Sequence, residues 1–467
     1  MQTIETDYLV IGAGAVGLAF ADTLIDESDA HITIVDRHGK PGGHWNDAYS
    51  FVALHQPSAF YGVNSLPLGT GRKDVAGVNE GLYELASGPE VSGYFDAVMR
   101  QKLLASGRVS YFPMSDYKGD GRFTSLLSGK ETAVNVRKKI VNATYFGTSV
   151  PSTHTRQFAV EDGVRIVTPN ALPHLWKSGE AMPENYVVLG AGKTAMDVVN
   201  WLLGSGAEPQ QIHWVVPRDS WLINRRTTQP GIEFFDSVFG GQAAQMEAFA
   251  SSGSVDEIFD RLEAAGSMLR IDPEVRPTMF HYATISEGEI EELRRVRNVI
   301  RQGRVTAISA EGLTLQQGFV PMPQGTLYID STASAVEHKP TQPIFEEGLI
   351  TPQLVRVPQP AFSAALIAYV EAHYPDDAEK NRLCQPVPFT HNMSDYPRTN
   401  IANMTNQYNW MQDVALSRWI RDSRLDGFGK VMGQIERSDT AKMDVISKMR
   451  SFAFPAMANL QKLAAAQ

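Results

Sequence analysis

The chain has very little cysteine. Its 467 residues include only Cys384. One thiol cannot form an internal disulfide or a Cys-x-x-Cys pair, which excludes enzymes that reduce disulfides with two thiols of their own. A lone cysteine is most often a small buried residue, and we expect this of Cys384.

Long apolar runs are also missing. No stretch reaches the ~18 consecutive apolar residues that a membrane-spanning helix needs. A strand pattern begins by about Asp7, with Glu5 before it, where a signal peptide would have a basic start and a longer apolar run. The sequence therefore predicts a soluble cytoplasmic protein without a membrane span.

The chain has no excess of basic residues and no recognisable metal or nucleophile motif. Its 42 Lys and Arg against 52 Asp and Glu give a net charge of −10, which argues against nucleic acid as a partner. The 11 histidines lack metal-ligand spacing, so we expect no metal. No Gly-x-Ser-x-Gly turn of a serine hydrolase occurs.

What the chain does contain is a glycine turn close to its start. A short apolar run at 8–11 predicts a buried parallel strand, and a helix pattern follows to about Leu24. Between them lie Gly12, Gly14 and Gly17. A second strand at about 31–35 ends at Asp36, 19 positions after Gly17. These parts together predict a dinucleotide-binding unit.

Each part of this unit has a physical task. Gly12 permits the tight turn, Gly14 lets the backbone approach a pyrophosphate, and Gly17 lets the helix pack against the strand. The helix N-terminus offers free N–H groups and a positive dipole end to the phosphates. Asp36 can accept hydrogen bonds from the ribose hydroxyls. A glycine turn without a ligand is the disfavoured alternative, because all the parts agree.

A second glycine turn follows about 180 residues later. A strand at 186–189 leads into Gly190, Gly192 and Ala195, and a helix pattern runs on to about Leu203. Lys193 and Thr194 lie at the helix start, where their side chains can reach a pyrophosphate. This second turn therefore also predicts a dinucleotide site.

The two units differ at the end of their second strand. The strand at 212–216 ends at Pro217-Arg218 without an acid, and Arg225 and Arg226 follow. A carboxylate would repel a 2′-phosphate, whereas an arginine binds it with charge-assisted hydrogen bonds. Arg218 therefore suits NADPH, while Asp36 suits a cofactor without that phosphate. The alternative for Arg218 is a surface charge, and this alternative is stronger for Arg225 and Arg226.

The residues that follow Asp36 carry a resemblance to a known family. The run from Asp36 and Arg37 to Gly42, Gly43, His44 and Trp45 resembles the flavin-containing monooxygenase-like (class B) family. In that family an acid–Arg pair and then Gly-Gly-x-Trp line the FAD. The resemblance implies that Arg37 and Gly43 contact FAD, with His44 and Trp45 beside the flavin or its ribityl chain. For Trp45 the alternative is a core aromatic.

Two further family marks are present in altered form. Family members usually have Ala-Thr-Gly where the chain passes between domains, and here Ala143 and Thr144 are followed by Tyr145. Near the end of the second domain the mark starts at Asp330 and reaches Ala333 without glycine. The resemblance implies that Ala143, Thr144 and Asp330 lie at the cofactors, while the altered glycines loosen the subfamily assignment.

The catalytic candidates come from the loop at 51–61. In family members this loop passes the flavin ring and often carries an asparagine near the reactive carbon. His55 and Gln56 occupy what looks like the same place, and Gln56 could supply a comparable amide. The alternatives are a loop glutamine satisfied by backbone and a structural histidine. The Baeyer–Villiger signature Phe-x-Gly-x-x-x-His is missing from 162–169, which makes ketone-to-ester chemistry less favoured.

The resemblance implies an enzyme that uses FAD and NADPH. NADPH would pass a hydride to the flavin, and a flavin C4a-hydroperoxide formed from molecular oxygen would transfer one oxygen atom to a nitrogen, sulfur or carbonyl of a small organic substrate. Because that species decays in water, the site must be closed and dry. Two rivals stay open: an NADPH-dependent flavin reductase or oxidase without oxygen insertion, and a non-catalytic FAD- and NADPH-binding redox sensor.

The expected fold class is α/β, with two Rossmann-like domains and a helical C-terminal region. We expect the FAD domain at 1–150 and 306–400, the NADPH domain at 151–305, and C-terminal helices at 401–467. A helical insertion at about 234–269 is a candidate lid or homodimer contact, or a buried helix pair. A further helix is expected at 286–302, where the acids between Glu287 and Glu292 suggest a solvated face.

Overall fold

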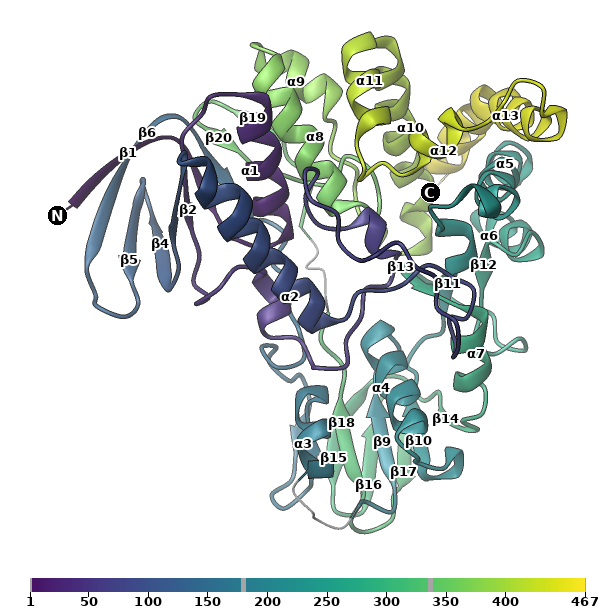
Figure 1. Cartoon of the computed structure of the whole chain (residues 1–467). Helices are drawn as coiled ribbons and strands as arrows, with labels where there is room; N and C mark the ends of the chain where they lie inside the picture. The colour runs from purple at the N-terminus through teal and green to yellow at the C-terminus, as the bar shows by residue number, and fades with distance from the viewer. Residues whose placement is uncertain (1, 178–181, 335–338, 467) are drawn as a thin grey trace.

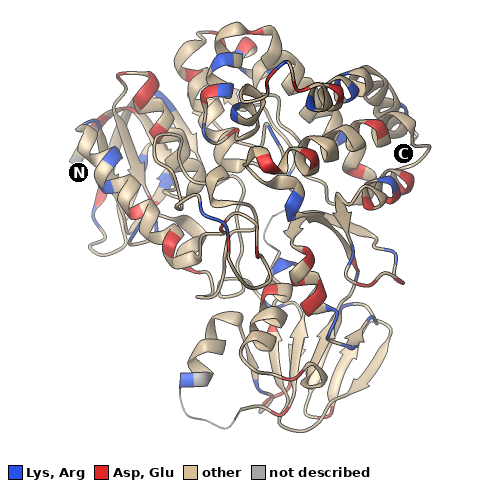
Figure 2. Cartoon of the chain, turned by 45° about the vertical axis from the view of Figure 1, so that its right-hand side comes forward, with Lys and Arg blue, Asp and Glu red and all other residues tan. Residues whose placement is uncertain are grey.

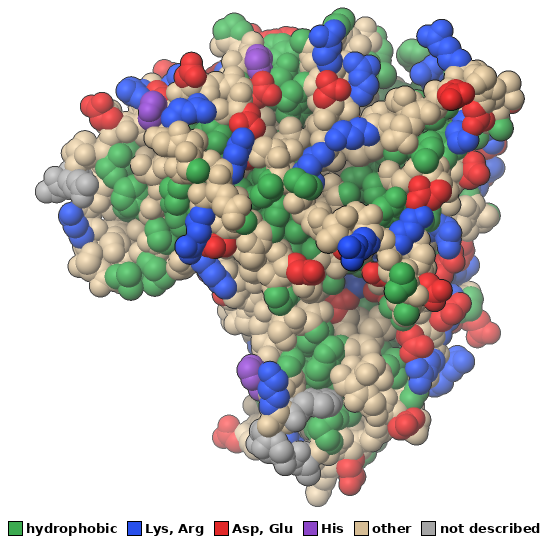
Figure 3. Space-filling view, viewed as in Figure 1, with side chains coloured by type: hydrophobic (Ala, Val, Ile, Leu, Met, Phe, Trp, Pro, Cys, Tyr) green, Lys and Arg blue, Asp and Glu red, His purple; other side chains and the backbone are tan. Residues whose placement is uncertain are grey.

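The computed structural model describes residues 2–177, 182–334 and 339–466. Figure 1 shows the domain built on the N-terminal strands at the left and upper side, and a second domain below it. In the space-filling view these two parts form separate lobes (Figure 3). Acidic and basic residues are mixed over both domains (Figure 2). Within the described residues, no helix has the length and apolarity needed to cross a membrane.

The first domain is built on a sheet in the order β19-β20-β6-β1-β2-β3. The pairs β1–β2, β1–β6, β2–β3 and β20–β6 are parallel. The strands are β1 Gln2–Ile11, β2 Ile32–Val35, β3 Val109–Phe112, β6 Glu131–Asn142, β19 Phe345–Glu346 and β20 Leu349–Ile350, with the antiparallel pair β4 Ser115–Gly119 and β5 Arg122–Ser125 attached at β6.

Helices bury this sheet. Helix α1 (Ala15–Glu27) packs against α8 (Pro360–His373), and α2 (Gly88–Ala97) contributes to the same core. Leu9, Val10 and Ile34 are fully buried, which explains why these strands read as continuous apolar runs. Cys384 is also fully buried, in this core, and this confirms the expectation for it.

The second domain contains a parallel sheet in the order β14-β10-β9-β18-β8. Its strands are β8 Ile166–Val167, β9 Tyr186–Leu189, β10 Ile212–Val215, β14 Asn298–Ile300 and β18 Leu327–Asp330, and its helices are α3 Leu172–Lys177, α4 Lys193–Gly204 and α7 Glu287–Leu293. A small sheet on its flank joins β7 Ala159–Val160, β15 Val305–Ser309, β16 Gly312–Leu315 and β17 Gly318–Pro321. The α/β class with two Rossmann-like units is confirmed.

Two sequence expectations differ from this arrangement. The domain boundary at 305 and 306 does not match the strand pairing, because β18 pairs with β9 and β8 of the second sheet. We therefore propose that the second domain extends to Asp330 and that the first domain resumes after it. The helix expected at 286–302 ends at Leu293, because Val299 and Ile300 pair with β10 as a strand.

The helical insertion consists of α5 (Phe235–Ser251) and α6 (Val255–Ala264). Helix α5 packs along the long C-terminal helix α13 (Thr440–Ala465) and against α6 (Figure 1). The three helices share a core that includes the fully buried Phe249, Phe259 and Leu460. This contact within one chain favours the buried-helix interpretation of the insertion. The neighbouring elements are β11 Ser220–Asn224, β12 Met268–Leu269, β13 Met279–Ile285, α9 Asp377–Leu383, α10 Tyr396–Gln412, α11 Val414–Asp422 and α12 Phe428–Gly433.

Candidate functional site

The first glycine turn is sterically closed to larger residues. Gly12 follows β1 with φ +101°, a left-handed conformation that favours glycine. A Cβ at Gly17 would lie 2.0 Å from the carbonyl oxygen of Gly12, so helix and turn touch here. A Cβ at Gly43 would lie 3.0 Å from Cα of Gly14. The turn before α1 and the turn containing Gly43 thus form one narrow cradle.

Other residues predicted for FAD gather at the same strand ends. Ala143 N–H donates to the carbonyl of Ile11 at 3.0 Å, and a Cβ at Gly12 would lie 2.9 Å from Cγ2 of Thr144. The N-cap of α1 is Gly14, without a side-chain cap and with no acid in the first turn. The first N–H groups of this helix are therefore available to an anion.

The carboxylate of Asp36 lies at the end of β2 beside the turn. It is 7% exposed, and its Oδ2 accepts from Ala13 N–H at 2.5 Å. Its Oδ1 accepts from His38 N–H at 2.7 Å, and the His38 ring lies on the same oxygen. Arg37 beside it is exposed. Asp36 is therefore fixed at the position that a ribose would reach.

The turn after Asp36 holds His44 and Trp45 on the short 3-10 helix η1 (Gly43–Asn46). Their rings stack at 5.4 Å, and the indole N–H of Trp45 donates to the Tyr61 hydroxyl at 2.8 Å. Burial lowers the pKa of His44 to about 4, so His44 is neutral at pH 7. These contacts give both side chains a fixed orientation beside the glycine turn.

Tyr145, which replaces the usual glycine, contacts the returning chain. Its hydroxyl donates to the carbonyl of Pro340, and Lys339 Nζ donates to the carbonyl of Tyr145 at 2.7 Å. The two crossings between the domains therefore lie side by side. The substitution has a packing role that glycine could not supply.

The second glycine turn has the same backbone but a more open face. Gly190 has φ +114°, and a Cβ there would lie 2.8 Å from the Ser331 carbonyl oxygen. A Cβ at Gly192, the N-cap of α4, would meet no atom within 4 Å, which leaves room at the helix N-terminus. Thr194 and the fully buried Ala195 follow in the first turn of α4. This arrangement fits an incoming pyrophosphate.

Asp330, predicted at the cofactor, is held by its own chain. It is 1% exposed and accepts from Arg156 Nε at 3.2 Å and from Thr332 Oγ1 at 2.6 Å. His154 Nε2 lies 3.3 Å from the same carboxylate. These partners fix the strand end next to Gly190, and a direct contact of Asp330 with a cofactor stays a prediction.

Lys193 does not point into solvent at the helix start. Its amine pairs with Asp197 one turn further along α4 and lies 3.1 Å from Glu289 on α7. Glu289 also binds Arg225 at 2.5 Å, and Arg225 is fully buried. The expectation that the acids of 287–292 form a solvated face is therefore wrong for Glu289, which is 6% exposed.

Mutual attraction stabilises this buried cluster of Lys193, Asp197, Arg225 and Glu289, which we call the interdomain quartet. Burial acts to raise the pKa of Glu289, but the charges of Lys193 and Arg225 hold it down to about 2. Burial acts to lower the pKa of Lys193, yet Asp197 and Glu289 raise it. Glu289 and Lys193 are therefore both charged at neutral pH. Sequence reasoning missed Glu289, although Ser286 and Glu289 form a capping box that is visible in the sequence.

The loop with the catalytic candidates rests on this quartet. Tyr49 donates to Asp197 at 2.7 Å, and Nε of Arg225 donates to the carbonyl of His55 at 3.1 Å. Burial and the nearby cations lower the pKa of His55 to about 4, so its ring is neutral at pH 7. The half-buried Gln56 has no protein hydrogen-bond partner for its amide within the described residues. This amide could therefore bind a ligand.

Arg218 lies at the carboxyl edge of the second sheet, together with an arginine that sequence reasoning missed. Val216 N–H, just beyond β10, donates to the carbonyl of Ile300, so the segments after β10 and β14 are neighbours. Arg304 follows β14, and both arginines are exposed. Burial and the charge of Arg304 lower the pKa of Arg218. Within the described residues neither guanidinium pairs with a carboxylate.

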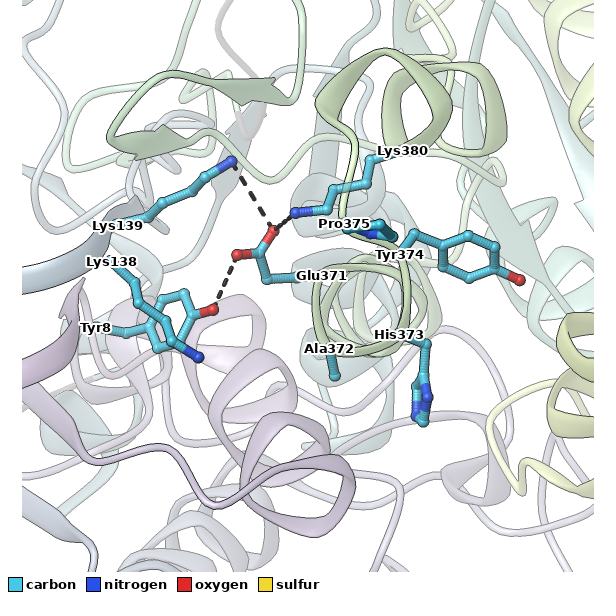
Figure 4. Close-up of a pocket in the computed structure, with 9 residues that line it drawn as sticks. All are labelled: Tyr8, Lys138, Lys139, Glu371, Ala372, His373, Tyr374, Pro375 and Lys380. Carbon is cyan, nitrogen blue, oxygen red and sulfur yellow. Dashed lines mark hydrogen bonds and ion pairs between the residues drawn. The ribbon is translucent and has the colours of Figure 1, made fainter.

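A pocket on the first domain has no residue of either glycine turn in its lining, which comes from β1, β6 and the segment from α8 to α9 (Figure 4). The Tyr8 hydroxyl, Lys380 and Lys139 point at Glu371 on α8, with distances of 2.8, 2.6 and 3.9 Å to its carboxylate oxygens. Asp377 accepts from Lys139 at 2.7 Å. Because these charges neutralise one another, we interpret the residues that line this pocket as a structural ion cluster at α8.

Comparisons with known proteins agree with this geometry. Residues 10–65 match the model of the NAD(P)-binding Rossmann-like domain family. The chain is 47% identical over 446 residues to uncharacterized proteins of Mycobacterium tuberculosis and Mycobacterium bovis, covering 96% of this chain and 82% of each relative.

Two solved structures with a similar fold are monooxygenases. The polycyclic ketone monooxygenase of the thermophilic fungus Thermothelomyces thermophila aligns with a TM-score of 0.53 at 14% identity, over 100% of this chain and 88% of that one. A cyclohexanone-bound cyclohexanone monooxygenase aligns with a TM-score of 0.50 at 14% identity, over 82% and 92% of the two chains. The chain therefore belongs to the same family as the mycobacterial proteins and has the fold of the flavin-containing (class B) monooxygenases.

Proposed function

We propose that the protein is an oxidoreductase that binds FAD at the first glycine turn and NADPH at the second. The observation that carries this proposal is the contrast at the two strand ends, a fixed carboxylate at Asp36 and two unpaired guanidiniums at Arg218 and Arg304. A shared backbone motif with opposite charges at its end fits two cofactors that differ by a 2′-phosphate.

For FAD, the fit rests on the narrow cradle. Gly14 and Gly43 leave no space for side chains between the two turns, so a pyrophosphate would approach the backbone itself. Asp36 would accept a hydrogen bond from the adenosine ribose, and the His44–Trp45 pair would lie towards the flavin end. Bound FAD would supply the redox chemistry, accepting a hydride from NADPH and delivering electrons to oxygen.

For NADPH, the fit rests on the open face of α4 and the two arginines beyond it. The N-terminus of α4 would bind the pyrophosphate, since no side chain caps it. Arg218 and Arg304 would bind the 2′-phosphate from neighbouring strand ends with charge-assisted hydrogen bonds. Because the Lys193 amine is engaged in ion pairs near the interface between the domains, backbone N–H groups rather than this amine would bind the phosphates.

The finer proposal is a monooxygenase that inserts one atom of molecular oxygen into a small organic substrate. The residues at the domain interface support it, because the loop of Tyr49 and His55 is hydrogen-bonded to the second domain and Tyr49 is buried, as a site closed to water requires. In this proposal the Gln56 amide orients a reacting group. The neutral His55 at pH 7 offers one ring nitrogen as donor and one as acceptor.

A reductase or oxidase without oxygen insertion is the second candidate. The altered marks favour it, since Tyr145 ties the two domain crossings together where the flavin-containing monooxygenases have a glycine. Such a contact would restrain the relative movement of the domains.

The test compares the amount of NADPH consumed with the amounts of labelled product and hydrogen peroxide formed. The purified chain is incubated with NADPH, labelled molecular oxygen and a panel of amines, sulfides and ketones. A monooxygenase places one labelled atom in a product for each NADPH consumed. Release of hydrogen peroxide equal to NADPH consumption, with no labelled product, would favour the oxidase instead.

A further inference from the structure

His38 occupies a place that the cofactor proposal leaves unexplained. It follows Asp36 by two residues and lies between two carboxylates from different turns. Its Nδ1 is 3.0 Å from Asp36 Oδ1, and its Nε2 is 2.8 Å from Asp47 Oδ2. Its backbone N–H also donates to Asp36, at 2.7 Å. The ring therefore bridges the carboxylate that would bind ribose and a second acid.

Asp47 connects this bridge to the rest of the site. It directly follows η1, which carries His44 and Trp45. Its backbone carbonyl accepts from Ser152 Oγ at 2.6 Å and from Asn170 Nδ2 at 3.0 Å. Ser152 lies in the crossing into the second domain, and Asn170 lies just after β8 of that domain. A displacement of Asp47 would therefore disturb both the turn that carries His44 and Trp45 and the crossing between the domains.

The bridge requires a proton on each ring nitrogen. A neutral imidazole donates from one nitrogen only, so its other nitrogen would face a carboxylate lone pair. Burial acts to lower the pKa of His38, but the hydrogen bonds and charges of Asp47 and Asp36 outweigh it and raise the pKa above its ordinary value of 6.5.

The other charged and titratable groups around the bridge do not replace it. His44 on η1 is neutral at pH 7, and the Arg37 side chain is exposed. Tyr111 on β3 is uncharged, because burial and the charge of Asp36 raise the pKa of its hydroxyl. His38 is therefore the cation that holds Asp36 and Asp47 together.

We propose that protonated His38 is the positioning residue of the first cofactor site. It holds the Asp36 carboxylate towards the adenosine ribose of FAD and fixes the turn that carries His44 and Trp45. Because Oδ1 already accepts hydrogen bonds from His38, the ribose would donate mainly to Oδ2, which Ala13 N–H orients. This inference rests on the proposed binding of FAD and adds to it a cofactor affinity that depends on pH.

The test is the rate at which the full-length FAD-loaded protein releases its cofactor, followed by the rise of flavin fluorescence from about pH 6 to about pH 9. In the unchanged chain, release accelerates roughly tenfold as His38 loses its proton, since one charge-assisted hydrogen bond is lost. His38→Gln releases FAD roughly tenfold faster at the acid end, with a flat pH profile.

Two further variants make the result specific. Asp47→Asn leaves Asp36 and the glycine turn in place and should flatten the pH profile as well. His31→Gln is the matched control, because the His31 ring is exposed and lies 3.8 Å from Asp7, and the variant should keep the profile of the unchanged chain.

The outcomes separate this inference from the proposed function. If His38→Gln and Asp47→Asn retain FAD with the rate and pH profile of the unchanged chain, the role of His38 is disproved and FAD binding stands. If the unchanged chain takes up no FAD at any pH, the cofactor assignment itself fails, and this inference fails with it.

Discussion

The two glycine-turn units of this protein have one backbone plan and different ends. In the first unit the second strand ends at Asp36, buried and fixed by Ala13 and His38. In the second it ends at Arg218, exposed and close to Arg304. In the proposed function, the same backbone turn binds a pyrophosphate in both units, and the charges beyond the second strand select the dinucleotide.

The units also differ at the residue after the second glycine. The first has Ala15, and α1 buries most of its length in the core of the first domain. The second has Lys193, which joins Glu289 and Arg225 in the interdomain quartet. The first unit is thus fixed by packing, whereas the second is fixed by charges that also hold the loop of His55.

The largest expected effect comes from the steric difference between the turns. Gly17→Ala would place a methyl 2.0 Å from a backbone oxygen, so we expect a loss of about 3 kcal/mol or more in stability and loss of bound FAD. Gly192→Ala meets no atom within 4 Å, so the fold should persist while the KM for NADPH rises. Thermal unfolding and flavin content measure both effects.

Gly93→Ala on α2 is the control for that comparison, since it too meets no atom within 4 Å and lies in a helix. It should leave stability unchanged or raise it by up to ~1 kcal/mol. A Gly17→Ala protein that unfolds at the temperature of the unchanged chain would contradict the closed cradle.

The next effect concerns the interdomain quartet. Glu289→Gln leaves Lys193 and Arg225 without their shared carboxylate, and we expect a loss of about 3 kcal/mol at pH 7, measured by chemical unfolding. The folded pKa of about 2 lies below the ordinary 4.5, so this stability is present above about pH 4.5 and is lost as the pH falls towards 2. The difference between the variant and the unchanged chain should shrink over that range.

Glu292→Gln on the same helix is the matched control, because Glu292 forms an exposed pair with Arg295. Its removal should cost at most ~1 kcal/mol. Equal losses for the two substitutions would show that Glu289 does not act as a buried ion-pair partner.

A smaller effect tests the choice of cofactor. Arg218→Ala and Arg304→Ala should each raise the KM for NADPH about tenfold, since each removes a charge-assisted contact to the 2′-phosphate. The KM for NADH should stay the same, because NADH lacks that phosphate. Arg297→Ala is the control, since Arg297 precedes β14 at the opposite edge of the sheet. An equal rise in the KM for NADPH and for NADH would contradict the proposed 2′-phosphate site.

The smallest effect concerns the contact between the domains. Tyr49→Phe removes one hydrogen bond to Asp197 and keeps the ring packed on Phe51, so a loss of roughly 1 kcal/mol is expected in thermal unfolding. Tyr83→Phe removes an exposed hydroxyl contact with Glu233 and should have almost no effect. A larger loss for Tyr83→Phe would reverse the assigned importance of the two contacts.

Much of the fold was predictable, because each signal was local. The strands at β1, β2, β9 and β10 and the helices after both turns lie within a few residues of the positions that apolar runs and glycines indicated. The turn of Gly12, Gly14 and Gly17 follows from backbone geometry, which glycine spacing encodes directly. The helix pair of the insertion was likewise evident from its apolar periodicity.

The parts that were missed depend on contacts between distant segments. Glu289 lies 96 positions from Lys193 and 64 from Arg225, and no local pattern marks a buried acid that satisfies two cations. Arg304 reaches Arg218 only because β14 pairs with β10, and the apolar residues of β14 were mistaken for the end of a helix. Its three residues are too few to display a strand period.

In the proposed function, electrons pass from NADPH at the second unit to FAD at the first. The most direct measurement is anaerobic mixing of the FAD-loaded chain with NADPH or NADH, with the flavin absorbance followed over time. We expect NADPH to bleach the flavin at much lower concentration than NADH, and we expect this preference to be lost in Arg218→Ala combined with Arg304→Ala. Bound FAD that stays oxidised in the presence of saturating NADPH would contradict it.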